Sequence, residues 1–185
     1  MNRLVLVTAV WFLAAGAFAQ QSEVGARREN QQDRIAQGVS SGQLTAAETA
    51  NVEKKESAIN QEVRTDRSLN GGHLTGQERQ IVNQQQNQMS WQIYQDKHNG
   101  ATQHYDNNEV DARRENQQGR IAQGIRSGSL NAAQTARLEK GEAGINHEVN
   151  ADRGANGGKL TSGERTQVNH QQNQMSRRIY NNKHK

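Results

Sequence analysis

The sequence predicts an all-α protein made of tandem duplicated three-helix units. The 185-residue chain contains no proline, so no residue of that kind interrupts a helix. Its sparse apolar residues recur at the three- and four-residue spacing of a helix. Residues 24–99 align with residues 110–185 at an offset of 86, and 48 of the 76 positions are identical. Self-similarity at one fixed offset is typical of a duplicated structural unit.

Residues 1–19 have the pattern of a signal peptide. Asn2 and Arg3 form a short positive head, an apolar run extends to Phe18, and Ala17 and Ala19 place small residues before Gln20. This pattern predicts cleavage after Ala19 and a periplasmic or secreted protein. An uncleaved anchor is the alternative, and the polar residues from Gln20 onward disfavour it. No later segment is apolar enough to predict a membrane span.

The remaining chain is poor in apolar residues. Residues 20–185 contain 22 Leu, Ile, Val and Phe residues, whereas Asn and Gln together number 42. The absence of cysteine excludes a disulfide scaffold, a cysteine nucleophile and a Cys-ligated zinc site. So few apolar residues predict a thin core, and we therefore expect self-association or an unidentified protein partner.

Glycine-containing junctions divide the chain into predicted units and helices. Gly42 and Gly72 can end a helix in the left-handed conformation, and Thr45 and Thr75 can cap the next helix. A Glu three residues after each Thr completes a capping box. We expect unit 1 over residues 20–99, a linker over 100–109 and unit 2 over 110–185. The predicted helices are near residues 23–40, 46–67, 76–97, 109–126, 132–153 and 162–183.

One apolar stripe is predicted on each helix of the first unit. The stripes consist of Val24, Ile35 and Val39; of Val52, Ile59 and Val63; and of Val82, Met89, Ile93 and Tyr94.

Polar side chains interrupt these stripes at one level of the predicted bundle. The interrupting residues are Arg28, Gln31, Glu56 and Gln86 in the first unit and Arg114, Gln117, Glu142 and Gln172 in the second. A buried polar layer is one hypothesis, and the solvated edge of a narrow apolar stripe is the other.

The Gly-x-Leu-Thr-x-x-Glu junctions resemble the second half of an EF-hand loop, which implies oxygen ligands for calcium. With one extra glycine allowed, the resemblance assigns ligands in two long loops. The candidates are Asp66, Ser68, Asn70 and Glu78 in loop 66–78, and Asp152, Asn156 and Glu164 in loop 152–164. Cation-free pseudo-EF-hand loops are the favoured interpretation, because the capping boxes explain the glutamates without an ion. Weak calcium binding is the alternative.

No other motif indicates chemistry. Each copy ends in Tyr-x-x-Lys-His, at Tyr94 to His98 and at Tyr180 to His184. The chain resembles uncharacterised exported bacterial helical-repeat proteins with EF-hand-like loops. That resemblance implies a non-enzymatic interaction or structural role with no cofactor. The net charge of +4 is small, and the Arg residues alternate with Glu. Nucleic acid is therefore not an expected partner.

Overall fold

The computed structural model describes residues 12–185, and this part of the chain is entirely helix and loop. Six helices lie within it, which confirms the all-α prediction. They are α1 (Phe12–Ser40), α2 (Ala46–Leu69), α3 (Gly76–His98), α4 (Glu109–Arg126), α5 (Ala132–Ala155) and α6 (Ser162–Lys183). Five of the six helices begin at the residue predicted from the sequence.

The first helix begins at Phe12, earlier than the predicted start near residue 23. Alanine has the highest helix propensity, so the Ala-rich end of the predicted signal peptide continues the helix. The remainder of that predicted segment, residues 1–11, lies outside the described residues. Among the described helices, none combines the length and apolar character that crossing a membrane requires.

Local hydrogen bonds fix where the helices begin. The predicted capping boxes of α2 and α3 are present at Thr45 and Thr75, and the equivalent boxes of α5 and α6 are present at Asn131 and Thr161. In each box the cap side chain accepts from the third helical N–H, and the third residue's side chain accepts from the cap N–H. Asn108 caps α4 through the Asp111 N–H.

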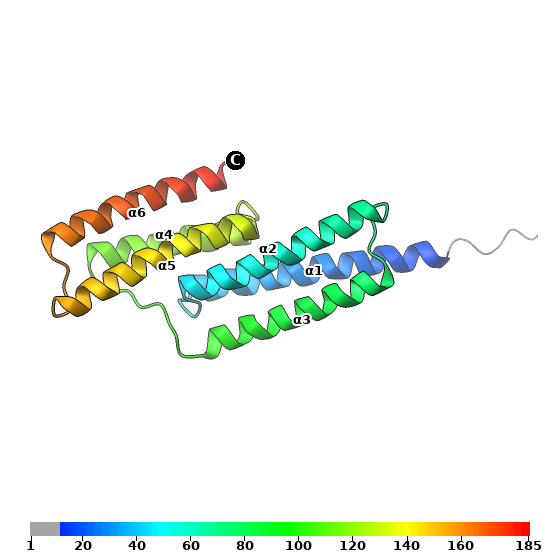
Figure 1. Ribbon diagram of the computed structural model, residues 1–185, viewed down its shortest axis with the longest axis horizontal. Helices are drawn as coiled ribbons and strands as arrows, with labels where there is room; N and C mark the ends of the chain where they lie inside the picture. Colours follow the sequence, from blue (N-terminus) through cyan, green and yellow to red (C-terminus); the bar gives the residue numbers. More distant parts are fainter. Residues whose placement is uncertain (1–11) are drawn as a thin grey trace, which may run out of the picture.

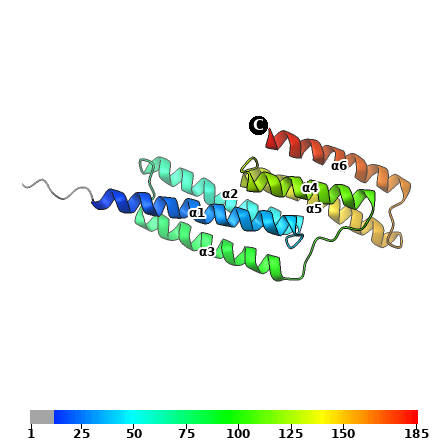
Figure 2. The same ribbon diagram turned by 180° about the vertical axis from the view of Figure 1, so that it is seen from behind.

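The helices form an elongated molecule in which two halves overlap at its middle (Figures 1 and 2). In the first half α3 packs against both α1 and α2, and in the second half α6 packs against both α4 and α5. The halves meet where α2 packs against α5 and α1 against α4, and the α2 contact with α5 is the most extensive of all. The tip of each hairpin, α1–α2 and α4–α5, thus lies against the middle of the other hairpin, while α3 and α6 lie on opposite sides (Figure 1).

The core follows the predicted stripes with one exception. Every predicted stripe residue of the first half is buried except Tyr94, which is 48% exposed. That prediction was wrong because Ile93 and Tyr94 are neighbours about 100° apart on the helix, and only Ile93 faces the core. The junction residues Leu44, Leu74, Leu130 and Leu160 are also buried, so each interhelical loop adds an apolar side chain to the core.

The two hairpin tips are closed by a contact between a glycine and a leucine. A Cβ atom added to Gly38 or to Gly124 would lie 2.6 Å from the Cδ1 atom of Leu44 or Leu130, respectively. The Leu44 and Leu130 N–H groups donate to the Gly38 and Gly124 carbonyls at 3.0 Å. Only a residue without a side chain lets these leucines fold back onto the helix.

We predict that Gly124→Ala destabilises the protein by about 1 to 3 kcal/mol, because its methyl group would overlap the Leu130 side chain. Gly119→Ala in the same helix is the matched control, since nothing lies within 4 Å of its added Cβ. Helix propensity alone makes that change stabilising by up to about 1 kcal/mol. Urea unfolding, followed by circular dichroism, measures the unfolding free energy of both variants. Equal effects of the two substitutions would contradict the packing argument.

Candidate functional site

The predicted calcium residues of the first long loop lie together but are occupied by hydrogen bonds. The Asn70 side-chain amide donates to both carboxylate oxygens of Glu78, each at 2.9 Å. The Thr75 N–H donates to Glu78 Oε2 at 2.7 Å. Ser68 does not join them, because its hydroxyl donates to the Thr65 carbonyl at 2.7 Å. The loop is therefore closed by an amide at the place where an EF-hand would direct ligand oxygens at a cation.

The second long loop has the same arrangement. Asn156 donates to both oxygens of Glu164 at 3.0 Å, and the Thr161 N–H donates to Glu164 Oε2 at 2.8 Å. Desolvation and the charges of neighbouring carboxylates, Glu164 first among them, raise the pKa of Asp152. Across residues 12–185, no group of three or more His, Asp or Glu side chains is placed to hold a metal ion. The residues as positioned do not fit a calcium cage.

The interrupting polar residues are buried and form the hypothesised layer, with Arg28 as the exposed exception. Gln31 donates from α1 to the Gln86 carbonyl of α3 at 2.7 Å and to Ser90 Oγ at 2.9 Å. In return, Gln86 donates to the Val24 carbonyl at 3.0 Å. The same three bonds recur 86 residues later, from Gln117 to the Gln172 carbonyl and to Ser176, and from Gln172 to the Val110 carbonyl.

Two further buried acids, Glu53 and Glu139, occupy the contact between α2 and α5. Both side chains are fully buried. Gln32 of α1 donates to Glu53 Oε2 at 3.2 Å, and Gln118 of α4 donates to Glu139 Oε2 at 2.9 Å. The other oxygen of each carboxyl has no hydrogen-bond partner. Neither residue was predicted from the sequence, although each is a Glu three positions before a predicted layer Glu.

Burial raises the pKa of each of the four buried glutamates. Desolvation raises the pKa of Glu53 to about 8, against the lowering effect of the Gln32 hydrogen bond. Desolvation likewise raises the pKa of Glu142 to about 8 despite the charge of Arg114. The pKa of Glu139 is raised well above its usual range by burial and by the charges of Glu142 and Glu53. Burial also raises the pKa of Glu56, which the charge of Arg28 partly opposes.

The second half also contains a buried ion-pair network. Asp111 is fully buried and pairs with Arg114 at 2.6 Å and with Arg153 at 2.9 Å. Although burial favours its neutral form, hydrogen bonds from Arg153, Asn108, Arg114 and the Asp106 N–H hold the pKa of Asp111 below its usual range. The position 86 residues earlier is Gly25, so the first half has no counterpart of this network.

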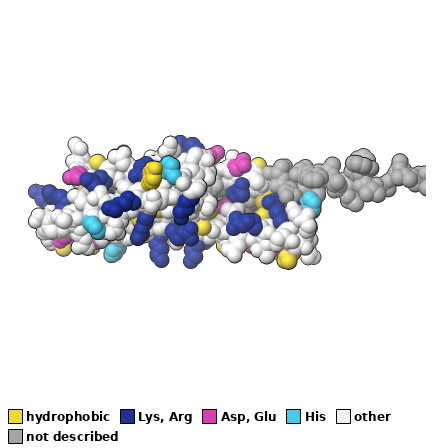
Figure 3. All heavy atoms as spheres, turned by 90° about the horizontal axis from the view of Figure 1, so that it is seen from above, with side chains coloured by type: hydrophobic (Ala, Val, Ile, Leu, Met, Phe, Trp, Pro, Cys, Tyr) yellow, Lys and Arg dark blue, Asp and Glu magenta, His cyan; other side chains and the backbone are white. Residues whose placement is uncertain are grey.

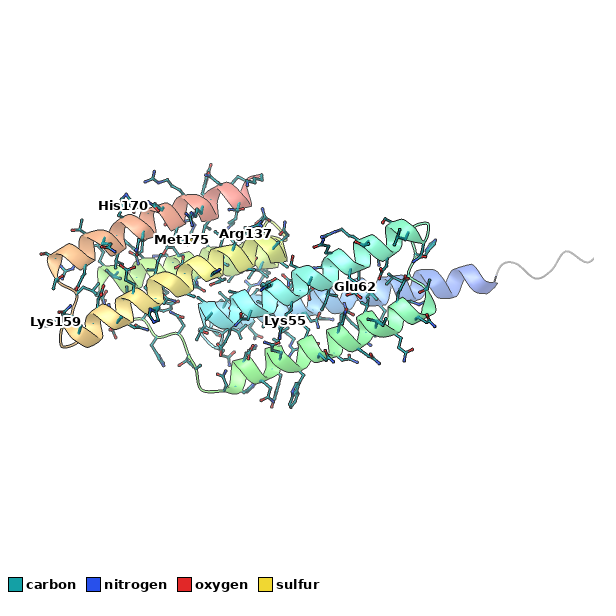
Figure 4. All side chains as sticks on the ribbon, viewed as in Figure 1. Lys55, Glu62, Arg137, Lys159, His170 and Met175 are labelled. Carbon is teal, nitrogen blue, oxygen red and sulfur yellow. The ribbon has the colours of Figure 1, made fainter. Side chains whose placement is uncertain are left out.

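Polar side chains also join the outer helices to the centre. Lys55 and Glu62 lie on the side of α2 that faces α3 (Figure 4). Gln85 donates to Glu62 at 2.8 Å, and Lys55 donates to Gln92.

The buried polar layer described above can hold protons and fix the positions of the helices. In this packed arrangement its carboxyl groups are out of reach of a substrate, because each of the four glutamates is at most 1% exposed.

We predict that millimolar calcium leaves the melting temperature unchanged, because the oxygens it needs already accept hydrogen bonds. Glu78→Gln should preserve stability to within about 0.5 kcal/mol, since Gln134 completes the equivalent capping box of α5. Circular dichroism and calorimetry, with and without calcium, measure the melting temperature and the stability of each protein. A rise in melting temperature that Glu78→Gln and Glu164→Gln abolish would establish calcium sites instead.

We predict that stability falls as the pH rises from about 5 to 8. Below the ordinary glutamate pKa of 4.5 the folded and unfolded states both keep the protons. Between 4.5 and about 8 only the folded state keeps them. Each such group lowers the unfolding free energy by up to about 1.4 kcal/mol per pH unit in that window.

Urea unfolding at a series of pH values measures this dependence. The double variant Glu53→Gln and Glu142→Gln should flatten it, because an amide does not titrate. Glu115→Gln, at an exposed position of α4, is the control and should leave the slope unchanged. Identical slopes in all three proteins would contradict protonated glutamates in the folded state.

Capped loops, a buried polar layer and a one-sided ion-pair network are the distinguishing features of this chain. No family model, no curated protein and no solved structure matches it. Its function is therefore inferred from its own residues.

Proposed function

We propose that this protein is an exported, non-enzymatic interaction protein built from two tandem three-helix units with EF-hand-like helix-loop-helix junctions. The signal-peptide pattern of residues 1–19 supports export, and the internal identity at an offset of 86 supports duplication. The hydrogen bonds that recur 86 residues apart are those expected of two copies of one unit. The same features underlie the resemblance to exported bacterial helical-repeat proteins.

The observation that carries the interaction role is a row of exposed rings on α3. Trp91 is 63% exposed and stacks on Tyr94, with ring centroids 5.9 Å apart. Tyr94 in turn stacks on His98 at 4.3 Å. Exposed aromatic side chains contribute strongly to protein association, because they bury a large area at a small cost in conformational entropy.

The outer helix of the other half offers a weaker version of the same surface. Tyr180 stacks on His184 at 4.2 Å, but Arg177 replaces the tryptophan. Since α3 and α6 lie on opposite sides of the molecule (Figure 1), their outer faces are both open to a partner. We propose that copies of the protein associate through the aromatic face of α3.

Calcium binding at loops 66–78 and 152–164 is the second candidate function. Its support is the proximity of Asp66 to Glu78, since desolvation and the Glu78 charge raise the pKa of Asp66. The Asn70 and Asn156 hydrogen bonds favour the first candidate.

We predict that Trp91→Arg abolishes self-association and leaves the fold intact, because α6 already has Arg177 at the equivalent exposed position. Sedimentation velocity over a range of concentrations measures association. The exported chain is used for these measurements, and mass spectrometry of its N-terminus tests the predicted signal-peptide cleavage, which would leave Gln20 as the first residue. Arg177→Trp is the matched control and should strengthen association. A wild-type chain that stays monomeric at every concentration would contradict this proposal.

A further inference from the structure

The linker between the halves forms part of the wall of a crevice in the second half, which has a volume of about 440 Å³. The crevice lies between the α1–α2 loop and the helices α4 and α5, and its neighbours include Thr102, Gln103 and His104 of the linker. The Gln103 N–H donates to the Gly42 carbonyl at 2.8 Å. The approach is close enough that a Cβ on Gly42 would lie 2.8 Å from the Gln103 carbonyl oxygen.

A tyrosine and an aspartate anchor this linker segment. The Arg114 guanidinium lies over the Tyr105 ring, 5.4 Å from its centroid. Next along the chain, the Asp106 N–H donates to Asp111 at 3.1 Å, and the Asp106 carboxylate lies 3.7 Å from Arg153. The segment thus uses two main-chain N–H groups, one ring and one carboxylate, the kinds of contact that peptides make in recognition grooves.

The equivalent crevice of the first half, called the open crevice below, has no linker segment in its wall. It has a volume of about 470 Å³ and lies between the α4–α5 loop and the helices α1 and α2. Gly128, the equivalent of Gly42, is exposed and has nothing within 4 Å of an added Cβ. Among the described residues, no N–H donates to its carbonyl. Arg28 is exposed, whereas its equivalent Arg114 is buried.

Two residues that hold the linker, Arg114 and Gly42, have identical equivalents at the first crevice, Arg28 and Gly128. The identical pairs at an offset of 86 are Arg28 and Arg114, Gln32 and Gln118, Asn60 and Asn146, Gly42 and Gly128, and Leu44 and Leu130.

The open crevice has more charged residues in its wall than its equivalent in the second half. Arg64 and Arg126 line it where Asn150 and Ser40 stand at the equivalent positions. Neither they nor Arg28 forms an ion pair with any described residue, although Glu29 and Asp33 also line the crevice. Lys and Arg side chains gather around the middle of the molecule on the face in Figure 3. Because Gly25 replaces Asp111, Arg28 has no equivalent of the carboxylate that pairs with Arg114.

We propose that the crevice between Arg28 and Gly128 binds an extended acidic peptide segment with an aromatic side chain, held as the linker is held in the second half. The proposal rests on the interaction role inferred above, but it concerns a surface separate from the aromatic face of α3. The aromatic ring would lie against the Arg28 guanidinium, a peptide N–H would donate to the Gly128 carbonyl, and an acidic side chain would pair with Arg64 or Arg126.

The test uses the exported chain and a fluorescein-labelled peptide with the sequence of residues 101–108, Ala-Thr-Gln-His-Tyr-Asp-Asn-Asn. Fluorescence anisotropy should show one site per chain. Arg28→Glu should weaken binding at least tenfold, and so should Tyr→Ala within the peptide. Ser127→Trp, which fills the crevice from the opposite wall, should do the same. Arg27→Glu is the matched control and should bind normally, because Arg27 contacts Asn87 of α3 outside the crevice.

Two results would overturn the proposal. One is equal affinity of Arg28→Glu, Ser127→Trp and Arg27→Glu for the peptide, and the other is no binding to the wild-type chain at about 1 mM peptide. Circular dichroism of each variant establishes that it is folded. Trp91→Arg should bind the peptide normally, and Arg28→Glu should self-associate normally, so the failure of either proposal can be told from the failure of the other.

Discussion

The packing of α2 against α5 is the contact on which the rest of the structure depends, and it buries two carboxyl groups. Glu53 and Glu139 lie in this contact with no solvent exposure, each with one hydrogen bond from a glutamine of a neighbouring helix. A carboxylate without a cationic partner is far more costly to bury than a neutral carboxyl group. Docking of the two halves is therefore coupled to protonation of the glutamates between them.

Buried polar side chains hold the helices together at positions that apolar side chains occupy in proteins with more apolar residues. Gln31 and Gln86 bridge α1 and α3 through main-chain carbonyls, and Gln117 and Gln172 repeat the bridge between α4 and α6. Such bonds contribute modest net stability, but their geometry specifies the register of one helix against another. A chain with few large apolar residues can reach one packed arrangement in this way.

The two halves share helices and hydrogen bonds but differ at their meeting point. Asp111 gives Arg114 a buried partner, and Tyr105 from the linker covers it, whereas Gly25 leaves Arg28 in solvent. The linker can line only one of the two equivalent crevices, because it directly precedes α4. An asymmetric molecule therefore results from two similar halves, and its open crevice follows from chain connectivity alone.

Local sequence determined five of the six helix starts and the face on which the interrupting polar residues lie, but it left open whether those residues are buried. The capping residues Thr45, Thr75, Asn131 and Thr161 act within one helical turn, and the spacing of Gln31, Glu56 and Gln86 places them on the core side of their helices. Sequence did not reveal the burial of Glu53 and Glu139, the outward position of Tyr94 or the anchoring of Tyr105. These features depend on which helices meet and at what level. Only the tertiary structure decided them, because periodicity defines the face of a helix but not the element that packs against it.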